Sequence, residues 1–208
     1  MLIEDRAERV AALASSGELA AACFELARFE LPELDSKPYE GRLDQMAAMV
    51  EGSGYLALRR VVAIREGYGG TLDDLRDPVH SYLHEVLDRR RGLPITLSAV
   101  WIEVGRRAGL SVQGVGLPGH FLVFAEGQLV DPFHGGEAIG ADEAASLVAQ
   151  AIGGPPRLNP DWLEPVSETD IVERMLRNLH QSYTITEPSR PRAWIPTCLQ
   201  ALGVGSEV

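Results

Sequence analysis

The sequence predicts an α+β fold in which a mainly helical N-terminal part packs on a small antiparallel sheet and a short helical C-terminus follows. Three observations lead to this prediction. Apolar residues recur at helical spacing through the first 66 residues. The pattern then changes to short apolar runs separated by glycine-containing turns over residues 110–133, which is typical of strands. Helical spacing returns over residues 169–183.

Four helices are expected in the N-terminal part, because each segment places apolar residues on one face at i, i+3 and i+4. Their ranges are residues 4–14, 18–30, 39–51 and 54–66. Leu31 precedes Pro32 and should end the second helix, since a residue before proline avoids helical backbone. Cys23 lies in the apolar stripe of that helix, so we expect a small buried side chain there.

Two further helices have clear start signals. Asp77 is a typical N-cap and Pro78 suits the first helical position, so a helix is expected over residues 77–91. Pro94 suits the start of the next helix, which is expected over residues 94–108. The apolar face of this second helix is expected to pack in the core.

A β-hairpin is expected next. Residues 120–125 and 128–133 are rich in strand-forming side chains, and Glu126–Gly127 between them is a turn signal. After the hairpin, helices are expected over residues 142–151 and 169–183.

The composition excludes several classes of protein. The chain has 208 residues and a net charge of −11 without a cluster of Lys and Arg, so we expect no nucleic-acid partner. Cys23 and Cys198 are too far apart in sequence to suggest a disulfide framework or a zinc cluster. The N-terminal residues lack the apolar stretch of a secretory signal, and no apolar run is long enough to span a membrane. We therefore expect a cytoplasmic protein, and its oligomeric state stays open.

The hairpin register places two polar side chains together. If Glu126–Gly127 forms a two-residue turn, Leu122 lies opposite Asp131. By the same register, His120 lies opposite Phe133. Residues two apart on a strand share a face, so His120 and Asp131 are diagonal neighbours with Cβ atoms about 7 Å apart. An imidazole and a carboxylate can close that gap.

Such a pair has a chemical use. A carboxylate would fix the tautomer of the His120 ring and favour its protonated form, as in a nucleophile–His–Asp arrangement. There is also a structural alternative. A single histidine in a strand is usually a structural residue, and Asp131 before Pro132 suits a turn. The residues alone leave both interpretations open.

Several segments resemble a known family. The stretch over residues 82–136 contains EVLDRRRGLPITLS, GVGLPGHFLV and DPFHGG, with FELARFELPELD upstream and RMLRNLHQSY downstream. Together they resemble the bacterial SirB-type branch of the transglutaminase-like superfamily over about residues 1–185. The resemblance implies a papain-like fold with a helix packed on an antiparallel sheet. It also implies a triad of a cysteine at that helix's N-terminus, a histidine on one strand and an aspartate on the next, and His120 and Asp131 match the last two.

The resemblance divides the chain into three expected parts. Residues 1–76 form the helical N-terminal part of the core, and residues 77–153 form the transglutaminase-like core of helices and hairpin. Residues 154–208 form a linker and a short helical appendage.

The expected cysteine is missing. Aligned on the family, Pro94 stands where that cysteine would be, and proline has neither a thiol nor an N–H. The hydroxyl of Thr96 or Ser98 could be activated by His120 instead. A threonine in the first helical turn, such as Thr96, more often bonds local backbone. Cys198 could also fold back from the tail, or water could be the nucleophile.

Several residues could line the cleft, although Tyr82, Phe133 and His134 are equally plausible as core residues. We expect the cleft to be lined by Pro94, Gly119, Phe133, His134 and Tyr82. The glycines of GVGLPG lie between strands and not before a helix, so they do not suggest a phosphate-binding loop. Gly119 is expected to clear space beside His120 or to form a bulge.

The histidines also suggest a metal site as an alternative. His80 and His84 are four residues apart on one predicted helix and could join His120, Asp131 or His134 around a metal ion. Two helix histidines are more often surface or packing residues, so we predict no metal and no cofactor.

Two functions fit these features. One is an amide hydrolase or acyl transferase that acts on a peptide or protein, with His120 as general base, Asp131 orienting it, and Thr96 or water as nucleophile. The other is a transglutaminase-like cleft without catalysis, which binds a peptide or protein partner. The missing cysteine favours the second function, and the His–Asp pair on one sheet face favours the first.

Overall fold

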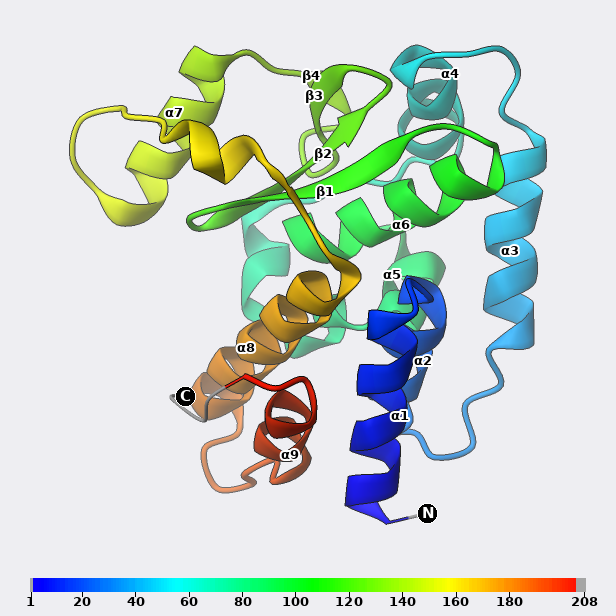
Figure 1. Cartoon of the computed structure of the whole chain (residues 1–208), viewed down its shortest axis with the longest axis vertical. Coiled ribbons are helices and arrows are strands. Elements are labelled where there is room, and N and C mark those ends of the chain that lie inside the picture. Colours follow the sequence, from blue (N-terminus) through cyan, green and yellow to red (C-terminus); the bar gives the residue numbers. More distant parts are fainter. Residues whose placement is uncertain (1, 205–208) are drawn as a thin grey trace.

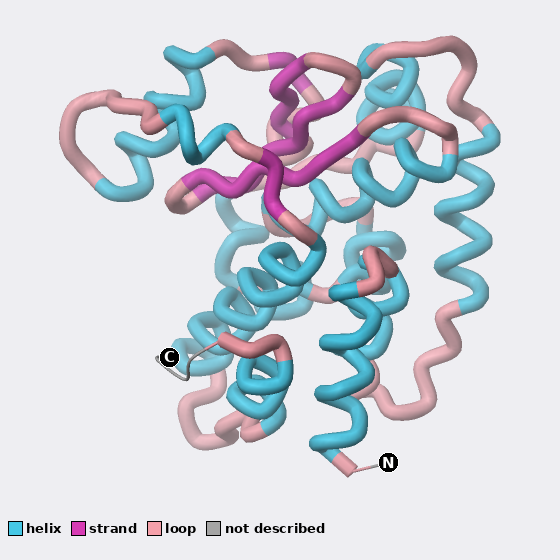
Figure 2. The backbone as a smooth tube through the Cα atoms, in the orientation of Figure 1, coloured by secondary structure: helices cyan, strands magenta, loops and turns pink. Residues whose placement is uncertain are grey.

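The structure is a computed structural model that describes residues 2–204. Helices form most of it, and an antiparallel sheet lies across one end (Figure 1 and Figure 2), which confirms the predicted α+β class. The α-helices are α1 (Ile3–Ser15), α2 (Leu19–Ala27), α3 (Lys37–Ala48), α4 (Tyr55–Arg59), α5 (Leu83–Arg89), α6 (Pro94–Arg107), α7 (Ala141–Ile152), α8 (Glu168–Thr186) and α9 (Trp194–Ala201). The strands are β1 (Val112–Leu117), β2 (His120–Ala125), β3 (Gln128–Asp131), β4 (Glu137–Ala138) and β5 (Pro165–Val166).

The hairpin register agrees with the prediction, but the second strand ends at Asp131 and does not continue to residue 133, because the chain turns after Asp131. The strand order is β4-β3-β2-β1-β5, and Phe124 pairs with Leu129 across β2 and β3. Glu126 and Gly127 form the two-residue turn, with φ values of 49° and 81°. Positive φ at both central positions gives the turn a twist that matches the strands. His120 and Asp131 therefore share one face of the sheet.

The sheet is covered on both faces. On one face, Phe121, Val123 and Val130 join the large core that the helices form. On the other face, Val115 and Leu122 pack in a smaller core with side chains of α7. Figure 1 shows α6 beneath the sheet and α7 on the opposite side. Both helical layers are needed, because both faces of this antiparallel sheet carry apolar side chains and each face must be shielded from water.

Helix α6 is the centre of the fold. All its residues from Ile95 to Gly105 are buried. Gly105 lets the sheet approach closely, because a Cβ atom there would lie 2.4 Å from a methyl group of Val112. Pro94 occupies the first turn of α6, and no side chain caps the preceding Leu93. The N-terminal end of α6 therefore keeps unpaired backbone N–H groups.

Two helical segments differ from the sequence prediction. The helix expected over residues 77–91 is a 3₁₀ turn (Pro78–Ser81) followed by α5, with extended backbone at Tyr82. The hydroxyl of Tyr82 hydrogen-bonds to that of Tyr183 on α8 at 2.8 Å. This tertiary contact accompanies the break. The helix expected over residues 54–66 changes after α4 into a π-helix, Arg60–Arg65.

The C-terminal tail contains a helix that was not expected. Trp194, Ile195, Cys198 and Leu199 of α9 are buried, and α9 packs against α1 and α8. The ring of Trp194 stacks on that of Phe29 with centroids 4.6 Å apart. The tail therefore belongs to the helical core. Within residues 2–204, no helix is long and apolar enough to cross a bilayer.

Candidate functional site

The site is built around one hydrogen bond between neighbouring strands. Nε2 of His120, the first residue of β2, lies 2.9 Å from Oδ2 of Asp131, the last residue of β3. Both residues are buried, with 8% and 1% of their surface exposed. The hairpin register carries the two side chains to the same face, and the His120 ring meets the Asp131 carboxylate where the two strands end.

Asp131 is the acceptor for more than His120. Its Oδ2 also lies 2.7 Å from Nδ1 of His134, and its Oδ1 accepts a hydrogen bond of 2.9 Å from the backbone N–H of Phe133. Burial by itself raises the pKa of this carboxyl group, but the hydrogen bonds and charges of His120 and His134 outweigh burial, so the pKa lies below its usual value. Asp131 is therefore an ionised acceptor at neutral pH.

An ionised carboxylate fixes the tautomer of His120. Because it can only accept hydrogen bonds, the Nε2 atom that faces it carries the proton. The neutral ring then keeps Nδ1 as an unprotonated base. The ring of Phe133 meets the His120 ring edge-on, with centroids 5.9 Å apart, and holds its orientation by packing.

The DPFHGG segment is held at two points. The N–H of Gly70 donates to the carbonyl of Phe133 at 2.9 Å, and a Cβ at Gly70 would meet the Phe133 ring at 2.0 Å. The N–H of Gly136 donates to the carbonyl of Asp131 at 2.8 Å. Gly136 has φ +68°, and a Cβ there would lie 2.3 Å from the ring of Trp101 on α6. Two glycines thus allow the close packing that positions Asp131.

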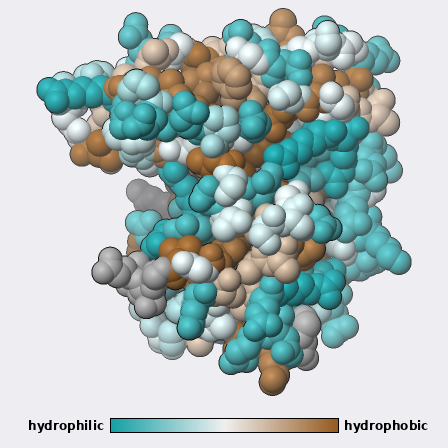
Figure 3. Space-filling model, viewed as in Figure 1, coloured by the Kyte–Doolittle hydropathy of each residue, from teal (hydrophilic) through white to brown (hydrophobic). Residues whose placement is uncertain are grey.

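A cleft of about 640 Å³ opens beside His120. One side is formed by Pro94 and Ile95 at the start of α6 and by Gly119 before β2, and the other by residues of α8. Figure 3 shows the surface hollowed between the upper part of the molecule, which holds the sheet and α7, and the lower part, which holds α8. The N-terminal end of a helix and the histidine therefore face the same open space.

Not every predicted lining residue is in this cleft. Pro94, Gly119 and His120 line it. His134 lies instead with Asp131 in a second hollow of about 480 Å³ beside α7, where its side chain is 57% exposed. Phe133 is buried beneath the histidines. Tyr82 is not among the residues that line the cleft, because its hydroxyl is buried against Tyr183.

The hydroxyl groups considered as nucleophiles are inaccessible. Thr96 and Ser98 both have 0% of their surface exposed, and neither hydroxyl has a hydrogen-bond partner among the described residues. Neither residue lines the cleft. A group without access to the cleft cannot attack a substrate bound there.

The two thiols are also remote from the site. Cys198 lies buried on α9, where burial raises the pKa of its thiol to about 12. Its fold-back to the cleft, considered from the sequence, is wrong because α9 packs on α1 and α8. Cys23 is buried in α2 as expected, and burial raises the pKa of its thiol far above the usual value. A thiol with a raised pKa carries little thiolate and reacts poorly.

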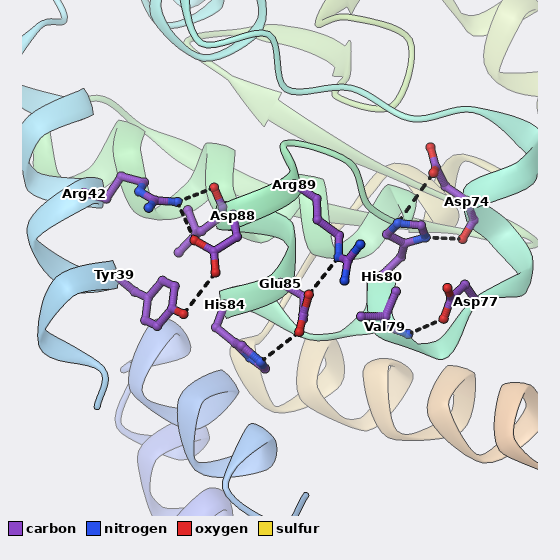
Figure 4. A network of polar contacts seen from close by, with 11 residues as sticks. Tyr39, Arg42, Asp74, Asp77, Val79, His80, His84, Glu85, Asp88 and Arg89 are labelled. Atoms are coloured by element: carbon purple, nitrogen blue, oxygen red, sulfur yellow. Dashed lines mark hydrogen bonds and ion pairs between the residues drawn. The ribbon is translucent and has the colours of Figure 1, made fainter. Parts of the chain in front are cut away.

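One cluster of described residues could hold a metal ion. Its members are His120, Asp131 and His134, whose ligand atoms lie within 4.8 Å of one another. Two histidines and one carboxylate suit several transition metals. His80 and His84 do not join them. Figure 4 shows His80 beside Asp74, with Nδ1 3.0 Å from the Asp74 carbonyl, and His84 beside Glu85.

Arg174 and Asn178 also line the cleft, and sequence reasoning did not single them out. They lie one turn apart on α8, within the RMLRNLH segment. The sequence indicates that these two polar residues, four positions apart, share one face of a helix. It does not indicate the docking of α8 against the β1–β2 turn, which brings them to His120.

Comparison with known proteins gives a consistent result. A family model described as "Transglutaminase-like superfamily" matches residues 33–177. A UPF0162 protein of Xylella fastidiosa (strain 9a5c) is 37% identical over 177 residues, which cover 77% of this chain and 63% of that protein. A UPF0162 protein of Pseudomonas aeruginosa is 32% identical over 158 residues, which cover 74% of this chain and 57% of that protein.

A more distant similarity is confined to a short region. F-box only protein 21 of Mus musculus is 36% identical over 70 residues, which are 32% of this chain and 11% of that protein. The chain spans less than two thirds of the bacterial relatives described above. No solved structure matches the chain.

Proposed function

Because this chain belongs to the transglutaminase-like superfamily and to its bacterial SirB-type branch, we propose that its cleft hydrolyses an amide or transfers the acyl group to another acceptor. The observation that carries the proposal is the 2.9 Å hydrogen bond between His120 and Asp131 at the edge of the cleft. The substrate is a peptide or protein.

In this proposal His120 is the general base and water is the nucleophile. Nδ1 takes a proton from the water molecule as its oxygen bonds to the amide carbonyl carbon. Asp131 keeps the ring oriented and stabilises the imidazolium that forms. The proton then passes from Nδ1 to the leaving amine nitrogen as the C–N bond breaks. An amine or hydroxyl in place of water would give acyl transfer.

The start of α6 supports the charged intermediate. Attack on the carbonyl leaves a negative charge on its oxygen, and N–H groups that point at this oxygen stabilise it. Ile95 lines the cleft directly after Pro94, and its N–H lies in the uncapped first turn. The positive end of the helix dipole adds to this effect. Pro94 contributes no N–H, so the site has one donor fewer than another residue would give.

The alternative is a cleft that binds a peptide or protein without chemistry. The observation in its favour is that no accessible nucleophilic side chain lies at the start of α6 among the described residues. Pro94 stands there, and Thr96 is buried. In that case His120 and Asp131 would be structural. Binding would then occur without turnover.

The test is turnover of a panel of peptidyl p-nitroanilides and p-nitrophenyl esters. We expect the wild-type chain to be active and His120→Ala to be slower by a factor of about 10² or more. His180→Ala is a matched control, because His180 lies on α8 but does not line the cleft. Equal rates for wild type and His120→Ala would contradict the proposal. No turnover by the wild type would favour the binding module.

A further inference from the structure

Arg174 forms part of the cleft wall opposite Pro94. It projects from α8, and its Nη2 donates hydrogen bonds to the carbonyl oxygens of Leu117 and His120, the latter at 2.9 Å. The guanidinium lies over the ring of Phe121, 5.5 Å from its centroid. These contacts fix the guanidinium at the mouth of the β1–β2 turn, beside the backbone of His120.

No acidic group among residues 2–204 forms an ion pair with Arg174, although the chain has 30 acidic and 19 basic residues. Its neighbours on α8 and α6 differ: Arg177 pairs with Glu173 at 2.9 Å, and Arg106 pairs with Glu168. Burial lowers the pKa of the Arg174 guanidinium, and no acidic group of the described residues offsets this effect. A partly buried charge without a partner is costly to a folded protein.

The donors of Arg174 are only partly used. Nη2 spends its two hydrogens on the two carbonyls. Nε and Nη1 have no hydrogen-bond partner among the described residues, and neither is a fully buried atom. They are therefore available to a ligand.

The described residues around Arg174 offer it no negative charge. None of those that line the cleft is acidic. Asn178 and Gln181 follow Arg174 at one and two turns along α8 and offer amide groups. Leu75 and Ile185 are apolar, with 44% and 72% of their surface exposed. Among the described residues that line it, the cleft thus combines the Arg174 guanidinium with neutral amides and apolar walls.

We propose that Arg174 forms a carboxylate-binding subsite, which holds a substrate carboxylate next to the amide that faces His120. The remaining N–H groups of Nη1 and Nε can each donate a charge-assisted hydrogen bond to a carboxylate oxygen. One cation balances one carboxylate, whereas a phosphate dianion calls for more positive charge. Leu75 and Ile185 would contact an apolar side chain of the same ligand. The position of the amide rests on the proposed function, but carboxylate binding does not require turnover.

The carboxylate can be the C-terminus of a peptide or an acidic side chain. Three probes distinguish these sources: N-acetyl-alanyl-leucine, its carboxamide, and N-acetyl-alanyl-glutamate as the α-carboxamide. Binding of each to the full chain is measured by isothermal titration calorimetry. We expect at least one of the two carboxylates to bind 10-fold or more tightly than the leucine carboxamide. The probe that binds tightly identifies the source.

The variants test whether Arg174 is responsible. Arg174→Gln should bind the carboxylate and the carboxamide equally, and Arg174→Lys should keep part of the preference. Arg177→Gln removes the same charge from the same helix outside the cleft lining and should keep all of it. Melting temperatures show whether each variant is folded, and the wild-type comparison stands even if Arg174→Gln unfolds.

The outcomes separate this inference from the proposed function. Equal binding of carboxylates and carboxamide by the wild type, no binding of any probe, or a preference that survives in folded Arg174→Gln would overturn the inference. His120→Ala should still prefer the carboxylate. If the wild type prefers it but turns nothing over, the subsite stands and only the catalytic proposal fails.

Discussion

His120 and Asp131 are joined by a hydrogen bond of 2.9 Å across β2 and β3, although eleven positions separate them in the sequence. The two-residue turn at Glu126–Gly127 sets the register that brings them to one sheet face. The glycine-rich loop after Asp131 then fixes the carboxylate through close packing on Trp101. The geometry of the His120–Asp131 pair is therefore built by one hairpin and one loop.

Acid should weaken the fold through Asp131. Its pKa in the folded chain lies below its usual value, which is about 3.9 in an unfolded chain. The ionised group therefore stabilises the fold above about pH 4, and this contribution is lost as the pH falls through the folded-state pKa. We expect Asp131→Asn to lower the free energy of unfolding by about 1–3 kcal/mol at pH 6 and by less at pH 3. Urea unfolding at both pH values measures this.

The control is Asp161→Asn, because Asp161 is exposed. It should change stability little at either pH. If wild type and Asp131→Asn lose stability in parallel between pH 6 and pH 3, Asp131 does not carry the effect.

Thr96→Val should keep turnover. The Thr96 hydroxyl is fully buried without a hydrogen-bond partner, so its replacement by a methyl group removes an unsatisfied polar group. We expect unchanged kcat and a stability equal to wild type or higher by about 1 kcal/mol. Ser98→Ala is a second variant of the same kind. A loss of activity in a folded Thr96→Val would instead identify this hydroxyl as the nucleophile.

Thiol reagents should leave the native chain unmodified. Cys23 and Cys198 are buried, and burial raises the pKa of both thiols. Mass spectrometry after treatment with iodoacetamide should show labelling only once the chain is denatured, with turnover unaffected before that. Rapid labelling of the native chain together with loss of activity would point to a cysteine nucleophile.

Gly136→Ala should destabilise the loop that holds Asp131. Gly136 has φ +68°, and its Cβ would lie 2.3 Å from the Trp101 ring. Gly135 is a matched control, since it has φ +73° but open space around a Cβ. Chemical denaturation should show a cost of about 1 kcal/mol for Gly135→Ala from the backbone alone. The overlap at Gly136 should add about 1–3 kcal/mol, and equal costs would contradict this packing.

Much of the site was predictable because it depends on local rules. The hairpin register follows from turn length and side-chain alternation, so the pairing of His120 with Asp131 could be derived from the sequence. The start of α6 follows from Pro94 in the same way. His134 was expected to line the cleft or lie in the core, but it lies with Asp131 in the second hollow beside α7. A turn of several residues has no periodicity that fixes its direction.

Tertiary contacts decided the remaining features. Extended backbone at Tyr82 accompanies its hydrogen bond to Tyr183, which is 101 positions away. Helix α9 is stabilised by packing of Trp194 on Phe29, and its short, proline-containing sequence has weak helical propensity. Arg174 reaches the cleft only because α8 docks beside the β1–β2 turn. None of these contacts leaves a periodic signal in the sequence.

The central claim is that His120 donates from Nε2 to Asp131 and keeps Nδ1 as the base. The ¹⁵N chemical shifts of the His120 ring at pH 8 test it without any substrate, with His120→Gln used to assign the signals. The account predicts a protonated Nε2 and an unprotonated Nδ1, and a loss of this preference in Asp131→Asn. A protonated Nδ1 with a bare Nε2 in the wild type would contradict it.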